Sequence, residues 1–345
     1  MSQAIVSDAQ ILADLKNQVA AGHIHRANLD GFEGLGSRRD RLANRAYLGL
    51  SFLARTLPPS GGSALFSWGF SNFGDLIPPV RKRIKAHLNL AFPDMDARAR
   101  LKLRKQFLRR FGQTVFESLA YERFAENLLE QVNLEGVEHI HAARAAKKPL
   151  ILVHAHQANW EIIFPVAKSL IDQELCGLYA ALSVPQLHRR TLHRRLEGGG
   201  RPYPRHFKGA LGYIMRDLRA GHPLIVALDQ RAPGETYPFL GHGAQTTLVP
   251  IRLALRTGAH LIPVDIERLE RIPTALGQGA QATSARDKKQ VSHKFRLTFH
   301  PNLIPEGKEK TADPAHILAR YNELLEGWIR ARPADWFWLH ERWAK

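Results

Sequence analysis

The stretch PLILVHAHQANWEIIF, residues 149 to 164, begins as an apolar run and ends in polar side chains. A short, partly β-branched apolar run such as residues 149–153 is typical of a buried parallel strand. In open α/β sheets, ligands bind at the carboxyl ends of the strands. His156 and Glu161 follow the run directly. We therefore predict that an imidazole and a carboxylate meet at this strand end, provided that the turn between them is tight.

Strand-like and helix-like segments alternate through the rest of this region. Residues 229–231, which read Asp-Gln-Arg, follow another buried run at 223–228, so polar groups arrive at a second strand end. The alternation predicts an α/β fold, with a central mixed, largely parallel sheet flanked by helices and a helical N-terminal portion. Residues 232–245 are expected to form a loop. The expected strands are 149–153, 176–182, 223–228, 260–266 and 294–300, and the expected helices are 188–195, 209–220, 246–256 and 313–330.

We expect one domain over residues 41–345, preceded by a polar extension over residues 1–40 that is mobile or loosely docked. Residues 41–135 should form a helical, membrane-facing part, and residues 136–345 the α/β part. Within the α/β part, residues 270–292 have few large apolar groups and are expected to form a flexible excursion.

An apolar run at residues 46–54 is the best candidate for membrane contact. It stops at Arg55 and Pro58, so it is shorter than the roughly 18 apolar residues that a spanning helix needs. Arginines precede the run and aromatic residues follow it, which is also typical of a helix that lies in the membrane interface. A core helix beside an aromatic loop is an equal alternative.

The chain is strongly basic, with 49 Lys and Arg against 32 Asp and Glu and a net charge of +17. Such a surface attracts phospholipid headgroups, nucleic acid or an acidic carrier protein. Aromatic residues do not interleave with the charges as they do in RNA-binding proteins, so no nucleic acid partner is expected. The single cysteine, Cys176, excludes an intramolecular disulfide, and the N-terminus lacks a secretory signal pattern. A reducing cytosolic compartment is therefore expected.

His156 is the candidate general base, because a carboxylate such as Glu161 can fix the tautomer of a histidine and stabilise its imidazolium. His154 has only Asn159 at the same offset, which makes His156 the better base. The chain has 17 histidines and chance pairings are expected, so the position at a strand end carries the argument. Asp229 is either a second carboxylate of the site or a turn cap.

Other chemistries have weaker patterns. A G-x-S-x-G nucleophile elbow is absent, and Cys176 lies in an apolar strand, where a thiol is usually inert. His154 and His156 could both reach one metal ion from a loop. However, H-E-x-x-H is missing and no third ligand is evident, so no metal is expected.

The segment His156-Gln-Ala-Asn159-Trp160-Glu161 resembles the H-x-x-N-W-E form of the H-x4-[D/E] motif. This form is found in the bacterial lipid A biosynthesis (Kdo2-lipid A lauroyl/myristoyl) acyltransferases, which belong to the lysophospholipid acyltransferase-like superfamily. The resemblance covers roughly residues 40 to 345, and the ordered set of matches is more specific than any one of them. The further matches, in the same order as in the family, are Asn89-Leu-Ala-Phe92-Pro93, Asp229-Gln230, Phe239-Leu-Gly241 with Thr246, Leu253-Ala254 through Thr257-Gly258-Ala259, and Trp336-Phe-Trp338-Leu-His340-Glu-Arg342-Trp343.

The resemblance implies transfer of a fatty acyl chain from acyl carrier protein or coenzyme A to a hydroxyl of a lipid acceptor similar to a lipid A precursor. It places such a protein at the cytoplasmic face of the bacterial inner membrane, as a peripheral or monotopic protein on an anionic surface. His156 would be the general base, Glu161 would orient it and balance its charge, and no cofactor beyond the acyl thioester is expected. The residues expected to bind substrate are Asn159, Trp160, Asp229, Gln230, Arg231, Thr246 and Arg268.

Two departures from the family pattern concern the acceptor. The family often has Tyr-Arg-Pro after the second strand and then Asn-Pro, where this chain has Tyr179-Ala180-Ala181 and Val184-Pro185. The arginine that would contact an acceptor phosphate is therefore missing at that place. A glycerolipid, lysophospholipid or amine acceptor is one alternative, and a non-catalytic basic protein that binds membranes is another.

Overall fold

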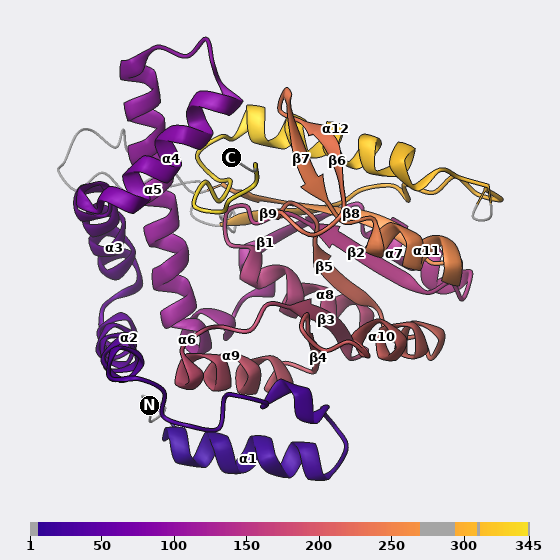
Figure 1. Ribbon diagram of the computed structural model, residues 1–345, viewed down its shortest axis with the longest axis horizontal. Helices are drawn as coiled ribbons and strands as arrows, with labels where there is room; N and C mark the ends of the chain where they lie inside the picture. Colours follow the sequence, from indigo (N-terminus) through magenta and orange to yellow (C-terminus); the bar gives the residue numbers. More distant parts are fainter. Residues whose placement is uncertain (1–5, 270–293, 309–310, 344–345) are drawn as a thin grey trace, which may run out of the picture.

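The computed structural model describes residues 6–269, 294–308 and 311–343 of the 345-residue chain (Figure 1). The predicted excursion at 270–292 lies outside the described residues. The strands are β1 (Val132–Glu135), β2 (Leu150–His154), β3 (Leu175–Tyr179), β4 (Gly200–Pro204), β5 (Leu224–Ala227), β6 (Glu235–Phe239), β7 (His242–Thr246), β8 (His260–Arg268) and β9 (Phe295–Phe299). The α-helices are α1 (Asp8–Ala20), α2 (Arg38–Thr56), α3 (Pro59–Phe73), α4 (Pro78–Ala91), α5 (Ala97–Leu119), α6 (Tyr121–Ala125), α7 (Val137–Ala145), α8 (Ile163–Ile171), α9 (Pro185–Glu197), α10 (Ala210–Arg219), α11 (Val249–Thr257) and α12 (Pro314–Ala331). The short 3-10 helices are η1 (Arg26–Asn28), η2 (Gly74–Leu76), η3 (Leu129–Gln131) and η4 (Trp160–Ile162).

Seven strands form one sheet in the order β1-β9-β8-β2-β5-β3-β4. β2 pairs in parallel with β5 and β8, and β3 pairs in parallel with β5 and β4. β9 runs antiparallel to β8 and parallel to β1. The prediction of a mixed, largely parallel sheet flanked by helices, with a helical N-terminal portion, is confirmed.

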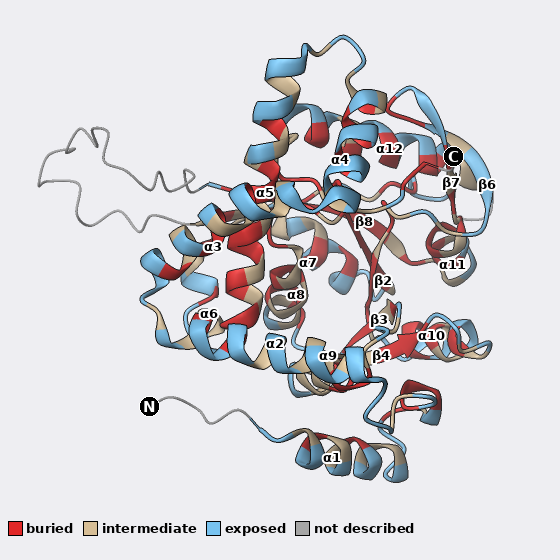
Figure 2. Ribbon diagram, turned by 60° about the vertical axis from the view of Figure 1, so that its left-hand side comes forward, coloured by how far each residue is buried: buried red, intermediate tan, exposed pale blue. Residues whose placement is uncertain are grey.

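Helices cover both faces of the central strand β2, all five residues of which are buried. Ile151 and Val153 belong to the core that α10, α11 and α12 share with one face of the sheet. Leu150 and Leu152 belong to the core under α7 and α8 on the other face. This two-sided burial, which Figure 2 shows in red, explains why β2 reads as a continuous apolar run instead of alternating.

The N-terminal helices pack around α5, and α3 approaches it closely at two glycines. A Cβ added to Gly62 would lie 2.2 Å from the Phe116 ring, and a Cβ added to Gly112 would lie 2.6 Å from the Phe66 carbonyl oxygen. The apolar run at 46–54 lies inside α2, which shows mostly exposed and intermediate residues in Figure 2. Within the described residues, no helix combines the length and the apolar character that crossing a bilayer requires.

The N-terminal arm, which we define as residues 6–36, is docked on α9 (Figure 1). Leu15 of α1 is fully buried in an apolar cluster with α9. Asp8 forms an ion pair with Arg189, whose side chain is only 1% exposed. Docking is one of the two alternatives that the sequence left open for residues 1–40, and the ion pair of Asp8 with buried Arg189 contributes to it.

Four strands of the described residues, β1, β4, β6 and β7, were not predicted from the sequence, and three of them have a physical reason. β6 and β7 form an antiparallel hairpin within the expected loop, and its outer residues are too exposed to alternate clearly. Its turn residues, Leu240 and Gly241, both have positive φ, as tight hairpin turns require. β4 contains Pro202 and Pro204, which are tolerated because β4 is the edge strand of the sheet.

Candidate active site

His156 and Asp229 meet because their strands are neighbours. β2 pairs with β5 so that His154 lies opposite Ala227, and each reactive side chain follows two residues later. His156 Nδ1 lies 2.8 Å from Asp229 Oδ1, and the His156 backbone N–H donates to Asp229 Oδ2 at 2.9 Å. An ionised carboxylate only accepts hydrogen bonds, so Nδ1 carries the proton and Nε2 is the basic nitrogen.

Asp229 is held in turn by Trp336. The Trp336 indole Nε1 donates to Asp229 Oδ2 at 2.9 Å, and the aspartate is only 2% exposed. Burial alone raises the pKa of Asp229. The charge of His156 and the hydrogen bonds from His156 and Trp336 outweigh burial and hold this pKa well below its usual range. Asp229 is therefore ionised under all ordinary conditions.

Residues 335–337, which we call the C-terminal clamp, fix the loop that carries His156. The Phe337 N–H donates to the His156 carbonyl oxygen at 2.9 Å, and the Ala158 N–H donates to the Asp335 carbonyl oxygen at 2.8 Å. Ala158 has a φ of 44°, in the left-handed region that non-glycine residues seldom adopt. The hydrogen bonds from the clamp determine this conformation, and with it the direction of the imidazole.

Glu161 does not form the hydrogen bond to His156 that the sequence predicted. Its carboxylate accepts from Trp160 Nε1 at 3.1 Å and forms an ion pair with Arg194 of α9 at 3.3 Å. The reason is that Asp229 already occupies Nδ1, while η4 begins at Trp160 and carries Glu161 toward α9.

The charge of Glu161 still acts on His156. Burial raises the pKa of Glu161, but Arg194, Arg195 and His156 together hold it below the usual value, so the carboxylate is ionised. Its negative charge contributes to the raised pKa of His156.

Asn159 and Arg268 are bound to the same buried carboxylate, that of Glu117. Asn159 Nδ2 donates to Glu117 Oε2 at 2.7 Å, and Arg268 donates to both oxygens at 2.6 and 2.7 Å. The Arg268 side chain is fully buried. This network joins α5 and β8 to the loop of His156, so both residues support the loop from behind and direct substrate contact is not expected of them.

Thr246 and Arg231 are also engaged within the protein. Thr246 Oγ1 accepts from buried Arg342 at 2.7 Å. Arg231 donates through its backbone to His340 Nε2 at 2.7 Å and through its guanidinium to Gln245 Oε1 at 3.1 Å. Of the residues predicted to bind substrate, Trp160 and Gln230 line the cavity beside His156.

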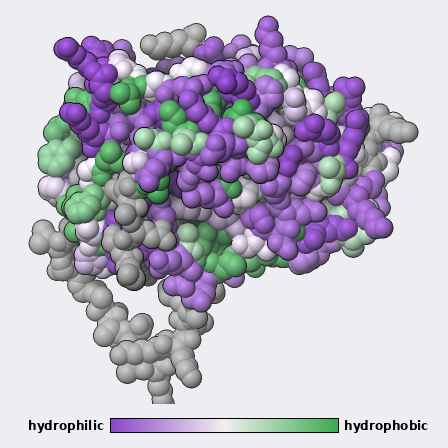
Figure 3. Space-filling view, turned by 90° about the horizontal axis from the view of Figure 1, so that it is seen from below, coloured by the Kyte–Doolittle hydropathy of each residue, from purple (hydrophilic) through white to green (hydrophobic). Residues whose placement is uncertain are grey.

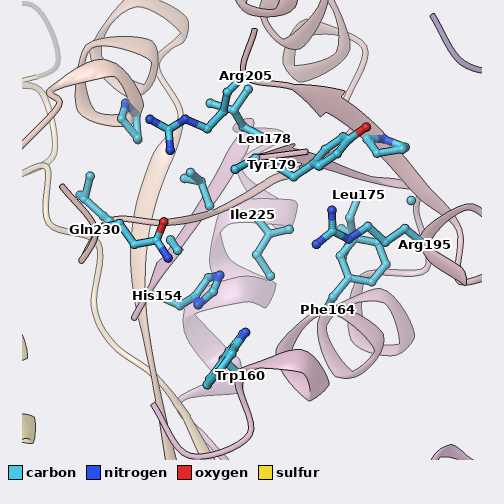
Figure 4. A pocket seen from close by; sticks show the side chains of 18 of the residues that line it. His154, Trp160, Phe164, Leu175, Leu178, Tyr179, Arg195, Arg205, Ile225 and Gln230 are labelled. Carbon is cyan, nitrogen blue, oxygen red and sulfur yellow. The ribbon is translucent and has the colours of Figure 1, made fainter. Parts of the chain in front are cut away.

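A cavity of about 690 Å³ lies beside His156 (Figure 4). It exists because β3 and β5 pair at only two positions, Cys176 with Leu224 and Gly177 with Ile225. Beyond these positions the strands separate, and residues of both line the cavity. In Figure 4, Ile225 lies between His154 and the β3 residues at the far side. The apolar part of the lining includes Phe164, Leu175, Leu178, Leu182, Leu211, Ile225 and Val249.

Cationic side chains line the same cavity. Two of them are paired with acids: Arg194 with Glu161, and Arg201 with Glu174 and Asp217 at 2.7 and 2.9 Å. These cations come from α9, from β4 and from the segment after β4. The cationic lining residues are Arg194, Arg195, Arg201, Arg205 and Lys208.

The two neighbouring histidines differ in their protonation. Burial lowers the pKa of both rings. For His156, the charge and hydrogen bond of Asp229, with a contribution from Glu161, outweigh burial and raise the pKa above its ordinary value. His154 has no such partner and the nearby His156 lowers it further, so its pKa is about 4. His154 is therefore neutral at pH 7.

The described residues offer neither a grouped set of metal ligands nor a reactive thiol. Across residues 6–269, 294–308 and 311–343, no three His, Cys, Asp or Glu side chains are grouped to hold a metal ion. The expectation that no metal takes part stays a prediction. Cys176 is buried, and burial raises the pKa of its thiol, as expected for an inert core residue.

The family profile described as bacterial lipid A biosynthesis acyltransferase matches residues 39–345. The chain belongs to this family. The lipid A biosynthesis acyltransferases are enzymes, and the match extends from α2 to the end of the chain, leaving the N-terminal arm outside it. No individual curated protein matches the sequence.

The site of this acyltransferase contains residues that the sequence analysis did not single out. Trp336 lies in a recognised motif, but the motif alone does not say that its indole reaches Asp229. Arg194 and Arg195 lie on α9, in the segment that the sequence predicted as a helix. Glu117 gave no signal, because a single acid in an amphipathic helix has no distinctive spacing.

Proposed function

We propose that the protein transfers a fatty acyl chain from a thioester of acyl carrier protein or coenzyme A to a hydroxyl of a membrane lipid similar to a lipid A precursor. One observation carries the proposal. His156 is hydrogen bonded to Asp229 through Nδ1, and the side chain of Gln230 lies at Nε2 of the same imidazole. His156 and Gln230 both line a cavity that has apolar and cationic walls. This arrangement suits a general base whose substrate has an acyl chain and a charged group.

The reaction needs one base and no redox change. His156 Nε2 takes the proton of the acceptor hydroxyl while the oxygen attacks the thioester carbonyl. The tetrahedral intermediate then collapses, the carbon–sulfur bond breaks, and the imidazolium returns the proton to the leaving thiolate. Asp229 stabilises the imidazolium between these steps, because its carboxylate lies 2.8 Å from Nδ1.

Gln230 is suited to contact the reacting groups. Its Nε2 lies 3.2 Å from His156 Nε2 and so occupies the position in which the acceptor hydroxyl would bind. When the hydroxyl takes this position, the amide becomes available to donate to the oxyanion of the intermediate.

In this proposal Asp229 orients the imidazole, and Glu161, which the sequence predicted as the orienting partner, acts on it through its charge alone. Glu161 borders the cavity and is ionised, and its ion pair with Arg194 holds it beside the imidazole. Its charge favours the protonated form of His156 in the intermediate.

The cavity lining supports an amphipathic substrate. Phe164, Leu175 and Ile225 offer an apolar surface to an acyl chain, and the arginines of α9 offer positive charge to an anionic headgroup. The overall charge of +17 also favours docking of an acidic acyl carrier protein.

A peripheral position at the cytoplasmic face of the inner membrane would give the cavity access to lipid. Large apolar side chains are exposed on α2 and α3, with Phe52 64%, Trp68 48% and Phe73 58% exposed. Figure 3 shows a largely hydrophilic face whose left-hand edge, the side on which Figure 1 shows α2 and α3, carries hydrophobic groups. Arg38, Arg39 and neighbouring cations on α2 suit an anionic interface.

The decisive experiment compares wild type with His156→Ala in transfer of a labelled acyl chain from acyl carrier protein to a bacterial membrane lipid extract. We expect the variant to lose at least about 10²-fold in rate, because the general base is removed. Circular dichroism and vesicle binding should stay unchanged, since His156 contributes to neither.

Full activity of His156→Ala would refute the proposed chemistry, whereas an inactive wild type would support a non-catalytic membrane-binding protein. Mass spectrometry of the product lipid identifies the acceptor. A labelled glycerolipid, lysophospholipid or amine would correct the acceptor without changing the mechanism.

A further inference from the structure

The N-terminal arm forms a second layer behind the wall of the cavity. It lies outside the residues that the family profile matches. Its η1 helix packs against β4, and two of its side chains reach residues that line the cavity. His25 stacks on Phe207 with ring centroids 4.0 Å apart, and Asn28 bonds to Tyr179.

Asn28 is the point at which the arm is joined to β3 and α9. Its side chain is fully buried, and Oδ1 accepts from the Tyr179 hydroxyl at 3.0 Å while Nδ2 donates to the His25 carbonyl oxygen at 2.8 Å. The carbonyl oxygen of Asn28 accepts from His188 Nε2 of α9 at 2.8 Å. Removing this amide would leave a buried tyrosine hydroxyl without its acceptor.

The guanidinium of Arg195 packs on the ring of Tyr179 in a cation–π contact, with Cζ 4.9 Å from the ring centroid. Both residues line the cavity, and Figure 4 shows them on the same side of it. Within the described residues, Arg195 forms neither a hydrogen bond nor a salt bridge, in contrast to Arg194 and Arg201, which are paired with acids. Burial lowers the pKa of Arg195, and Glu161 offsets this only in part.

The half-buried guanidinium of Arg195 borders the cavity without a hydrogen-bonding acid among the described residues, so it is available to bind an anionic group of a ligand. The planar fork of arginine matches a phosphate through two parallel hydrogen bonds. Arg205 and Lys208 add positive charge to the same cavity, which favours phosphate over a singly charged group.

We propose that Arg195 binds a phosphate group of the substrate and that the N-terminal arm positions it, through the contact of Asn28 with Tyr179. Arg195 is the binding residue and Asn28 a positioning residue. The assignment rests on the proposed acyl transfer in taking the cavity as the substrate site. The phosphate belongs to the acceptor lipid or to the phosphopantetheine of the donor.

The first test measures binding without turnover. Calorimetry is carried out on the full-length protein with dihexanoyl phosphatidic acid, and with uncharged dihexanoylglycerol as the matched probe. We expect Arg195→Gln to weaken binding of the phosphate probe roughly 10- to 100-fold, as for a lost charge-assisted hydrogen bond, and to leave the uncharged probe unaffected. Arg195→Lys should fall between wild type and Arg195→Gln, because it keeps the charge and loses the fork.

The second test isolates the arm. Asn28→Leu and Tyr179→Phe should each weaken binding of the phosphate probe roughly fivefold. The double variant should bind the probe no more weakly than either single variant, because both substitutions remove the same hydrogen bond. Arg26→Gln is the matched control, since Arg26 lies on the same η1 helix but, among the described residues, forms its ion pairs with Asp30 and Glu33 of the arm itself. If Asn28→Leu does not fold, Tyr179→Phe carries the test alone.

Kinetics with acyl transfer distinguish the source of the phosphate. A higher KM for the acceptor with kcat within about twofold assigns it to the acceptor, and a higher KM for the donor assigns it to the donor. Unchanged binding of the phosphate probe by Arg195→Gln would overturn the site. If Tyr179→Phe binds the phosphate probe as tightly as wild type, or if the losses of affinity add in the double variant, the role of the arm is overturned. If wild type binds the phosphate probe but transfers no acyl group, the proposed function fails and the phosphate site stands.

Discussion

At the scale of single residues, the imidazole of His156 is set by two acids with different positions. Asp229 is hydrogen bonded to Nδ1, whereas Glu161 acts from a distance through its charge. Sequence spacing favoured Glu161 as the orienting group, and the observed hydrogen bond favours Asp229. The two assignments lead to different consequences for mutation and for pH.

We expect kcat/KM of the wild type to rise with pH through the raised pKa of His156, because only the neutral ring accepts a proton. In Asp229→Asn, only the charge of Glu161 still opposes burial, so the pKa of His156 should fall and the acidic limb of the profile should move to lower pH. The maximal rate should drop roughly 10²- to 10⁴-fold, because the carboxylate no longer fixes the tautomer. A pH–rate profile from pH 5 to 9 checks both effects.

Glu161→Gln provides the comparison. It should lower the rate less than Asp229→Asn, because the hydrogen bond to Nδ1 is kept. A larger loss in Glu161→Gln, with an unchanged acidic limb in Asp229→Asn, would return the orienting role to Glu161.

At the scale of secondary structure elements, the loop of His156 depends on α5, β8 and the C-terminal clamp. The sequence indicated the strand end and the polar residues that follow it. It could not give the strand order, and the meeting of His156 with Asp229 follows from the pairing of β2 with β5. The sequence also could not give the buried hydrogen bond from Trp336 to Asp229, because these residues lie 107 positions apart.

Glu117 holds the buried network that joins α5 and β8 to the loop of His156, because it accepts hydrogen bonds from both Asn159 and Arg268. Glu117→Ala leaves the Arg268 guanidinium buried without its bidentate partner, so we expect a loss of about 3–5 kcal/mol in the free energy of unfolding. Urea titration followed by tryptophan fluorescence measures it. Glu174→Ala, which removes a half-exposed acid from Arg201, is the control and should cost about 1 kcal/mol or less. Equal losses in the two variants would refute the structural role of the buried network.

At the scale of the whole molecule, the exposed apolar groups of α2 and α3 lie on one side of a basic protein. The sequence indicated a short amphipathic segment here and left its role open between core and interface. The structure shows a helix pair with one side against α5 and large apolar side chains on the other, which periodicity alone could not decide.

We expect the double variant Phe52→Ser and Trp68→Ser to bind vesicles of phosphatidylglycerol and phosphatidylethanolamine at least about tenfold more weakly, because two large apolar side chains no longer enter the interface. Vesicle sedimentation measures the effect. Leu129→Ser, at a residue with similar exposure (49%) on η3, is the control and should bind like wild type. Equal binding by the double variant and the wild type would place the membrane contact elsewhere.

The hydrogen bonds around His156 span a long stretch of the chain, from Thr114, which donates to the Ala158 carbonyl oxygen at 2.8 Å, to Trp336. The motif at residues 156–161 is thus only one part of the site. The geometry of the site also depends on segments elsewhere in the chain that share no local sequence pattern. Grafting the motif onto the strand end of another α/β protein would transfer the histidine without its tautomer or its direction. A design that aims at this chemistry has to carry over the strand pairing of β2 with β5 and an equivalent of the C-terminal clamp together with the motif.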